Sequence, residues 1–313
     1  DKNGYFDPKT FQKKSQRPSI KMIEIKLSQG AKPSHGGVLP AAKITKEIAE
    51  IRGIERGQDC ISPPTHTAFS TPIEMMHFIQ QLRELSNGKP VGFKICIGYR
   101  RQFMSICKAM LETNIFPDFI TVDGAEGGTG AAPVEFTNYM GMPGDEAVAF
   151  VHNTLVGSNI RQHIKIISSA KVASGFDMIR RIALGADACN LARPMLFAIG
   201  CVQSVSCNTN KCPTGVATTK KSRAYAIKLK RKSQQVANFH RNTIHSFLEM
   251  LGAMGVHHPE ELNAHLIHIR EPNGKSTTCD YFYNFIEPGN FLSKDIHPFY
   301  KEFWEKSDAS SFA

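Results

Sequence analysis

Short hydrophobic runs typical of β-strands alternate along this chain with segments that repeat apolar residues at helical spacing. Most of these runs are followed directly by a helical pattern or by a loop rich in glycine. The pattern predicts strands over residues 20–26, 59–63, 91–97, 118–122, 164–168 and 188–191, and helices over residues 44–52, 70–85, 101–112, 146–156 and 176–184. Strands that alternate with helices of this length favour a parallel α/β architecture.

Six such units are compatible with an open sheet or with a barrel. The glycine-rich loops follow strands late in the series, as in barrels that bind phosphate after their last two strands. We therefore predict an α/β fold of the (β/α)8 TIM-barrel type that lacks its first two βα units. A C-terminal helical extension follows, with helices over residues 222–237 and 242–254. The barrel domain is expected over residues 1–268, including a cysteine-rich segment at 200–218, and a C-terminal tail over residues 269–313.

The bulk composition is that of a globular protein. The chain has 313 residues, of which 41% are hydrophobic and 21% are charged. Its eight cysteines are too few for a disulfide scaffold in a chain of this length, so we expect a reducing compartment, the cytoplasm. No apolar run reaches the length of a membrane span, and the N-terminus lacks the apolar region of a signal peptide.

The net charge of +10 favours acidic partners or anionic substrates. Much of the excess lies in one basic run at residues 220–232, which is either a solvated helix face or a docking surface for an acidic electron carrier. We expect no nucleic acid partner, because only Tyr225 lies among these charges as an aromatic residue.

Three cysteines lie within a dozen residues: Cys201, Cys207 and Cys212, the last followed by Pro213. Iron–sulfur clusters are held by thiolates crowded in this way, often with a final Cys-Pro. A zinc site would normally need a fourth ligand and usually a Cys-x2-4-Cys pair, and the chain has no Cys-x-x-Cys. Three thiols without a clear fourth favour a three-iron cluster, and therefore electron transfer.

Basic and polar residues follow the first predicted strand. Lys26, Gln29 and Lys32 lie where barrel active sites are found, and their charge suits a carboxylate substrate. Arg52, further along, would add a bidentate donor. Lys94 interrupts the apolar strand at residues 91–97, and we expect its partner to be a bound cofactor rather than an internal ion pair.

The loops that follow the later predicted strands have features typical of phosphate-binding sites. The glycine-rich residues 123–133 expose backbone N–H groups, although they match neither GxGxxG nor a P-loop. The turns at 168–171 and 190–193 follow the last two strands, and each carries a cation. His35 and His66 lie in loops near the same face, and His66 is equally compatible with a structural role.

Four motifs in order carry a resemblance to a known family. They are IEIKLSQGAKP at 23–33, ISPPTH at 61–66, DGAEGGTGAAP at 123–133 and GC-x5-C-x4-CPTGVAT at 200–218. Over about residues 15–265 the chain resembles the FMN-binding synthase domain of glutamate synthase, and most of all the stand-alone FMN-binding glutamate synthase proteins. The resemblance implies a (β/α)8 barrel with FMN and a 3Fe–4S cluster. It also implies addition of ammonia to 2-oxoglutarate, giving 2-iminoglutarate, and hydride transfer to that imine.

The resemblance also implies roles for single residues. The substrate carboxylates and keto carbon would be held by Lys26, Gln29, Lys32 and Arg52, with Lys26 and Lys32 as catalytic residues. The flavin would be contacted by Lys94, Gly127, Gly128 and Thr129, and its phosphate by Ser169, Lys171, Asn190, Ala192 and Arg193. The cluster would be ligated by Cys201, Cys207 and Cys212.

The chain departs from the family pattern at several positions. Val38 replaces a substrate-facing glutamine, His35 an acidic residue, and Ala170 a turn residue that is usually glycine. Family members also carry the first two βα units ahead of position 1. Ammonia and electrons would come from outside, the electrons from an acidic carrier such as ferredoxin. The alternatives are a truncated, non-catalytic remnant and a related flavin oxidoreductase acting on another 2-oxo acid or imine.

Overall fold

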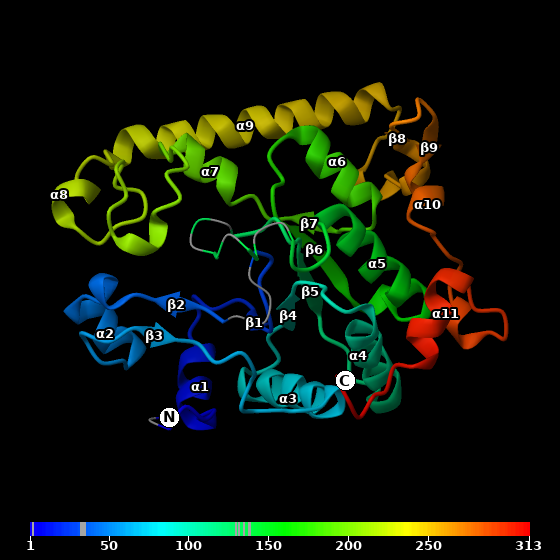
Figure 1. Cartoon of the computed structure of the whole chain (residues 1–313), viewed down its shortest axis with the longest axis horizontal. Helices are drawn as coiled ribbons and strands as arrows, with labels where there is room; N and C mark the ends of the chain where they lie inside the picture. Colours follow the sequence, from blue (N-terminus) through cyan, green and yellow to red (C-terminus); the bar gives the residue numbers. More distant parts are fainter. Residues whose placement is uncertain (2, 32–35, 129, 131, 134, 137–138) are drawn as a thin grey trace.

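A five-stranded parallel sheet forms the centre of the molecule (Figure 1). The computed structural model describes residues 1, 3–31, 36–128, 130, 132–133, 135–136 and 139–313. The strands lie in the order β1 (Ile23–Lys26), β4 (Val91–Ile95), β5 (Phe119–Asp123), β6 (Lys165–Ser169) and β7 (Ala188–Cys189). Every neighbouring pair is parallel, which confirms the predicted parallel α/β architecture. The closed eight-stranded barrel stays a prediction.

The strand predicted at residues 59–63 does not belong to this sheet. Within that segment β3 (Cys60–Ile61) pairs antiparallel with β2 (Val38–Leu39), and β1 pairs directly with β4. The run is too short to bury both faces as a central parallel strand must, and Ile61 stays 68% exposed. The six predicted sheet strands are therefore corrected to five among the described residues.

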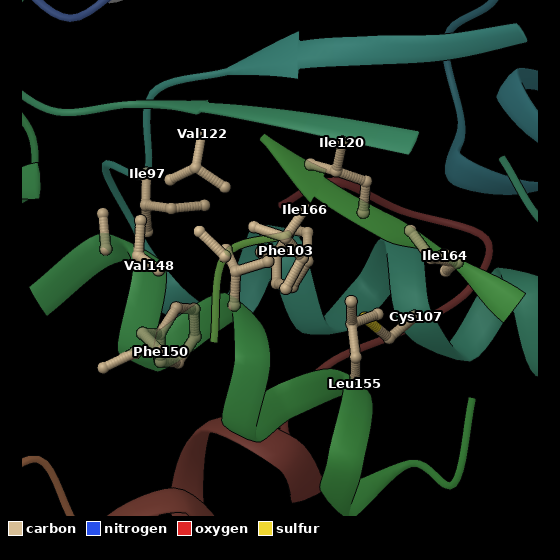
Figure 2. Packing of buried hydrophobic residues seen from close by; sticks show 14 of the residues in the cluster. Ile97, Phe103, Cys107, Ile120, Val122, Val148, Phe150, Leu155, Ile164 and Ile166 are labelled. Carbon is tan, nitrogen blue, oxygen red and sulfur yellow. The ribbon is translucent and has the colours of Figure 1, made fainter. Parts of the chain in front are cut away.

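Helices cover one face of the sheet and bury the apolar residues of every second strand position. Ile120 and Ile166 point from the strands toward Phe103 of one helix and Val148 of the next (Figure 2). Because side chains alternate across a strand, the intervening position in β5, Thr121, lies on the opposite face. The helices are α3 (Pro72–Leu85), α4 (Arg100–Thr113), α5 (Gly144–Gly157) and α6 (Gly175–Ala183).

The other described helices are short, apart from one long helix. The shorter elements are α1 (Pro8–Ser15), α2 (Lys46–Arg52), α7 (Arg193–Ala198), α8 (Lys221–Ala224) and the 3-10 helices Ala41–Lys43, Arg161–His163, Cys207–Thr209, Pro259–Glu261, Ala264–Leu266 and Asn290–Leu292. The helices predicted at residues 222–237 and 242–254 form mainly one 25-residue helix, α9 (Leu229–Ala253), because residues 238–241 between them continue the helix. None of the described helices is both long and apolar enough to cross a membrane.

The segment expected as an extended tail contains regular structure. It holds the hairpin of β8 (His268–Arg270) and β9 (Ser276–Thr278), with α10 (Cys279–Phe282) and α11 (Pro298–Glu305). The boundary expected between residues 268 and 269 falls inside β8. Asn153 of α5 is buried and donates hydrogen bonds to the Tyr283 carbonyl at 3.1 Å and to the Tyr300 hydroxyl at 2.8 Å. The C-terminal segment thus packs on the helices that cover the sheet.

Candidate functional site

The carboxyl ends of the five parallel strands meet at one edge of the sheet, and most of the predicted site residues follow these ends. The described ones are Lys26 and Gln29 at and after β1, Lys94 in β4, Gly127 and Gly128 after β5, Ser169 and Lys171 at and after β6, and Asn190, Ala192 and Arg193 after β7. Lys32, His35 and Thr129 lie outside the described residues. The parallel topology therefore places residues from distant parts of the sequence at a common edge.

The loop after β1 lies directly on the glycine-rich loop after β5. A Cβ atom at Gly30 would lie 1.7 Å from the Gly124 carbonyl oxygen, so only glycine permits this approach. The Ala31 N–H donates to the Gly127 carbonyl. Two motifs that are some 90 positions apart in the sequence therefore form one surface, with Gln29 next to the contact.

Asp123, the last residue of β5, joins these two loops to β4. It is 3% exposed, and its Oδ2 accepts a hydrogen bond from the Gly30 N–H at 2.9 Å. The same oxygen lies 3.0 Å from Nζ of Lys94. The expectation that Lys94 lacks an internal ion pair is therefore wrong, while its contact with a cofactor stays a prediction. The sequence analysis gave Asp123 no role, although an acidic residue that ends an apolar strand was a signal for one.

A cavity of about 330 Å³ opens beside the loop after β1. Its lining includes Lys26, Gln29, Ser62 and His66. A ring nitrogen of His66 lies 3.1 Å from the Lys26 carbonyl oxygen, and the ring stacks on Phe69, which supports the structural role for this histidine. The structure thus brings Lys26 and Gln29 together in the lining of one cavity.

Arg52 is not brought to this cavity. It lies in the last turn of α2, is exposed, and is absent from the described residues that line the cavity. Arg52 was expected to join Lys26 and Gln29 in one substrate site, but it is not among the described residues around this cavity. Its role in substrate binding stays a prediction.

A second set of charges holds the glycine-rich loop from the helix side. The Glu126 carboxylate accepts from the Gly144 N–H at 3.1 Å and lies 3.4 Å from an Arg181 guanidinium nitrogen. Arg181 is 3% exposed and also lies 3.0 Å from the Asp145 carboxylate. Since burying this guanidinium is favourable only with such partners, the network fixes the loop to the start of α5.

The turn after β6 adopts a conformation that glycine normally supplies. Ala170 has a φ of +87° and Lys171 a φ of +47°. Glycine adopts this left-handed backbone without the strain that a Cβ atom adds, which agrees with the glycine expected at position 170 from the family resemblance. Among the residues that the structure describes, a Cβ atom at Gly128 would meet nothing within 4 Å. The glycine surface and the nearby cations Lys171 and Arg193 fit a flat ligand with a phosphate group.

The three cysteines lie in the segment between α7 and α8. Cys207 borders the glycine-rich loop, since a Cβ atom at Gly130 would lie 2.9 Å from its sulfur. Burial raises the pKa of Cys212, but the Ala217 N–H, the Thr214 hydroxyl and further backbone N–H groups lower it more, to about 7. This sulfur is therefore prepared to act as a thiolate ligand.

The arrangement of the described side chains does not by itself form a mononuclear metal site. Among the residues that the structure describes, no three His, Cys, Asp or Glu side chains surround a point where one metal ion would bind. A multi-iron cluster takes one thiolate for each iron, so its ligands do not converge on a single point. The donor set of Cys201, Cys207 and Cys212 fits such a cluster chemically.

Asn210, between the second and third cysteines, holds this segment together and was not identified from the sequence. Its side-chain amide donates to the Ala42 carbonyl at 2.7 Å, and its side-chain oxygen accepts from the Thr218 hydroxyl at 2.8 Å and the Thr219 N–H at 2.8 Å. The only signal was an amide residue within a cysteine motif.

Comparison with known proteins gives one consistent family. The family model described as a conserved region in glutamate synthase matches residues 13–257. The chain is 36% identical over 279 residues to the glutamate synthase large subunit-like protein YerD of Bacillus subtilis, covering 89% of this chain and 53% of that protein. It is 34% identical over 249 residues to the archaeal glutamate synthase [NADPH] of Methanocaldococcus jannaschii, covering 79% and 48%.

The chain spans about half the length of these two relatives. Among solved structures, a flavocytochrome b2 mutant with benzoylformate matches with a TM-score of 0.48 and 14% identity, covering 83% of this chain and 50% of that one. A score at this level carries no functional argument.

Proposed function

Because the chain belongs to the glutamate synthase family, we propose that it supplies the FMN site of an enzyme that forms glutamate from 2-oxoglutarate and ammonia. The observation that carries the proposal is the contact between the loop after β1 and the glycine-rich loop after β5. This contact joins the loop of Gln29, which lines the cavity with Lys26, to the loop of Gly128, where a Cβ atom would meet nothing within 4 Å among the described residues.

Each described group at this edge has a defined task in the proposed reaction. Lys26 and Gln29 bind and orient the substrate carboxylates by charge-assisted and neutral hydrogen bonds, with Lys32 as a third donor. Lys171 and Arg193 bind the FMN phosphate with backbone N–H groups of the adjoining turns. Lys94 places a positive charge beside the flavin. When bound, FMN would supply the hydride that reduces the imine of 2-oxoglutarate.

The cysteine segment would hold the electron-transfer group. We propose that Cys201, Cys207 and Cys212 ligate a 3Fe–4S cluster, with support from their spacing and from the hydrogen bonds that favour the thiolate of Cys212. The basic run along α8 and the start of α9 suits an acidic electron carrier such as ferredoxin, since opposite charge speeds the encounter of two proteins.

A direct assay tests the proposal. The purified chain, reconstituted anaerobically with iron, sulfide and FMN, is mixed with 2-oxoglutarate, ammonium and reduced ferredoxin, and glutamate is measured. The proposal requires that glutamate forms only when 2-oxoglutarate, ammonium and reduced ferredoxin are all present. Turnover of a different 2-oxo acid, with none of 2-oxoglutarate, would instead favour the related oxidoreductase, consistent with exposed Val38 at a substrate-facing position. Assembly of the cluster with neither FMN uptake nor turnover would favour the non-catalytic remnant.

A further inference from the structure

We propose that Asp123 is a positioning residue that serves the flavin and the substrate loop at the same time. The inference rests on the proposed function, in which Lys94 lies at the flavin and Gln29 at the substrate. Asp123 touches neither ligand in this arrangement and acts through Lys94 and through the backbone of Gly30.

The Asp123 carboxylate is enclosed by three separate strands or loops. Lys94 comes from β4, and the Gly30 N–H comes from the loop after β1. The chain after β5 then folds over the carboxylate, because a Cβ atom at Gly127 would lie 2.3 Å from Oδ1. Because the Asp123 carboxylate is enclosed on three sides, its position is fixed. It therefore also fixes the Lys94 ammonium and the Gly30 N–H that it binds.

The ion pair is asymmetric in its burial. The Asp123 side chain is 4% exposed, whereas that of Lys94 is 23% exposed. The carboxylate is therefore the enclosed end of the pair, and the ammonium is the end that reaches the open carboxyl edge. Here the buried anion determines both where the lysine ammonium lies and how much positive charge the site presents.

The Asp123 carboxylate also binds the loop that carries Gln29, the proposed substrate ligand. Gly30 follows Gln29 directly, and its N–H donates to the charged carboxylate at 2.9 Å. Hydrogen bonds to charged groups are stronger than neutral ones. Loss of Asp123 should therefore loosen the loop that carries Gln29, in addition to changing the field at Lys94.

Two substitutions separate these effects. D123N removes the charge and keeps an oxygen that accepts from Gly30, whereas D123A removes both. E24Q is the matched control: Glu24 lies on β1, on the same face of the sheet, but its carboxylate accepts from the Thr121 hydroxyl at 2.6 Å. K94M tests the cation itself. The readouts are hydrogen exchange of the amides at residues 28–31 in the chain without flavin, and the midpoint potential of bound FMN.

In D123A the exchange of these amides is expected to be about tenfold faster than in the wild type, while D123N and E24Q stay close to it. In D123N the midpoint potential is expected to become more positive, because the site then carries more positive charge and stabilises the anionic reduced flavin. K94M shifts it in the opposite direction. Unchanged exchange in D123A, or an equal potential shift in E24Q, overturns the inference. If the wild type takes up no FMN, the proposed function fails, and hydrogen exchange alone still decides whether Asp123 holds the loop.

Discussion

The two edges of the central sheet both carry charged residues and a cavity, but the charges are used differently. The amino edge has the larger cavity, about 770 Å³, against two at the carboxyl edge of about 330 Å³ and about 430 Å³. There the Asp187 carboxylate accepts from the Ile166 N–H at 2.7 Å and pairs with Arg161 at 2.8 Å. Asp118 likewise accepts from the Val91 N–H at 2.8 Å. Both carboxylates bind the beginning of a neighbouring strand.

At the carboxyl edge, by contrast, the close contacts are made by glycine backbone. Gly30 approaches Gly124, Gly127 folds over Asp123, and Gly128 borders open space. Bare backbone beside open space admits a ligand, whereas carboxylates that cap strands stabilise the sheet. Cavity size therefore does not identify the functional edge here, and the kind of contact does.

The largest expected effect comes from G30A at the carboxyl edge. The added methyl would lie 1.7 Å from the Gly124 carbonyl, so the two loops must separate. Misplacement of a binding loop by about 1 Å lowers catalysis about 100-fold. We expect kcat/KM for glutamate formation to fall by about this factor. The control is G98A, after β4, whose added methyl meets nothing within 4 Å. Equal losses in both variants would show that the loop contact is not special.

D187A is the corresponding change at the amino edge. It removes the acceptor for the Ile166 N–H and leaves Arg161 and Lys165 without their shared carboxylate. Hydrogen bonds to charged groups contribute about 1.5–3 kcal/mol, so the free energy of unfolding should fall by about 3 kcal/mol. Urea denaturation measures it. The KM for 2-oxoglutarate should not change, and a large change in KM would contradict the division between the edges.

The amino edge should also make stability depend on pH through His152. Burial and the charge of Arg161 lower the pKa of its imidazole from 6.5 to about 4. The unfolded chain then binds the proton more readily, so this group's contribution is lost as pH falls from about 6.5 toward 4. At pH 5 the free energy of unfolding should be lower by about 2 kcal/mol than at pH 7 through this group. H152Q should flatten that slope in urea titrations; an unchanged slope would assign it to other groups.

The smallest effect is expected at the turn after β6. A170G removes a side chain from a backbone with a φ of +87°. Relief of left-handed strain contributes about 1–2 kcal/mol, and the greater freedom of glycine in the unfolded chain offsets about 0.5–1 kcal/mol of it. The net gain in unfolding free energy should be about 1 kcal/mol or less, measurable as a higher Tm. A lower Tm would mean that the buried methyl packs favourably against Gly127.

The sequence predicted the parts of this molecule that depend on local pattern. Strands such as β5 and helices such as α6 were found because their apolar spacing matches their burial. A strand was correctly predicted within residues 59–63, but its place in the central sheet was wrong, because two apolar residues between turn signals look alike in a separate antiparallel pair and in a sheet. The break expected within α9 is absent, because Asn238, His240 and Arg241 are compatible with an exposed helix surface and Phe239 between them is half-buried.

The candidate site was predicted less completely, because its key contacts join distant segments. Lys94 was recognised as unusual, but its partner Asp123 lies 29 positions away and is brought near only by the pairing of β4 with β5. The same holds for Asn210, whose amide binds Ala42. The family motifs predicted ligand-binding residues only as a set, and the contacts that position these residues became visible in three dimensions.

Two lysines near opposite ends of β6 allow the most direct test of the central claim, that the carboxyl edge binds the flavin. Lys165 begins the strand at the amino edge, and Lys171 follows its last residue at the carboxyl edge. FMN is titrated into the wild type, K165A and K171A, and binding is followed by flavin fluorescence. We expect that the wild type binds FMN saturably, that K165A binds FMN with the same affinity, and that K171A binds FMN more weakly. No binding by the wild type, or equal weakening in both variants, would contradict it.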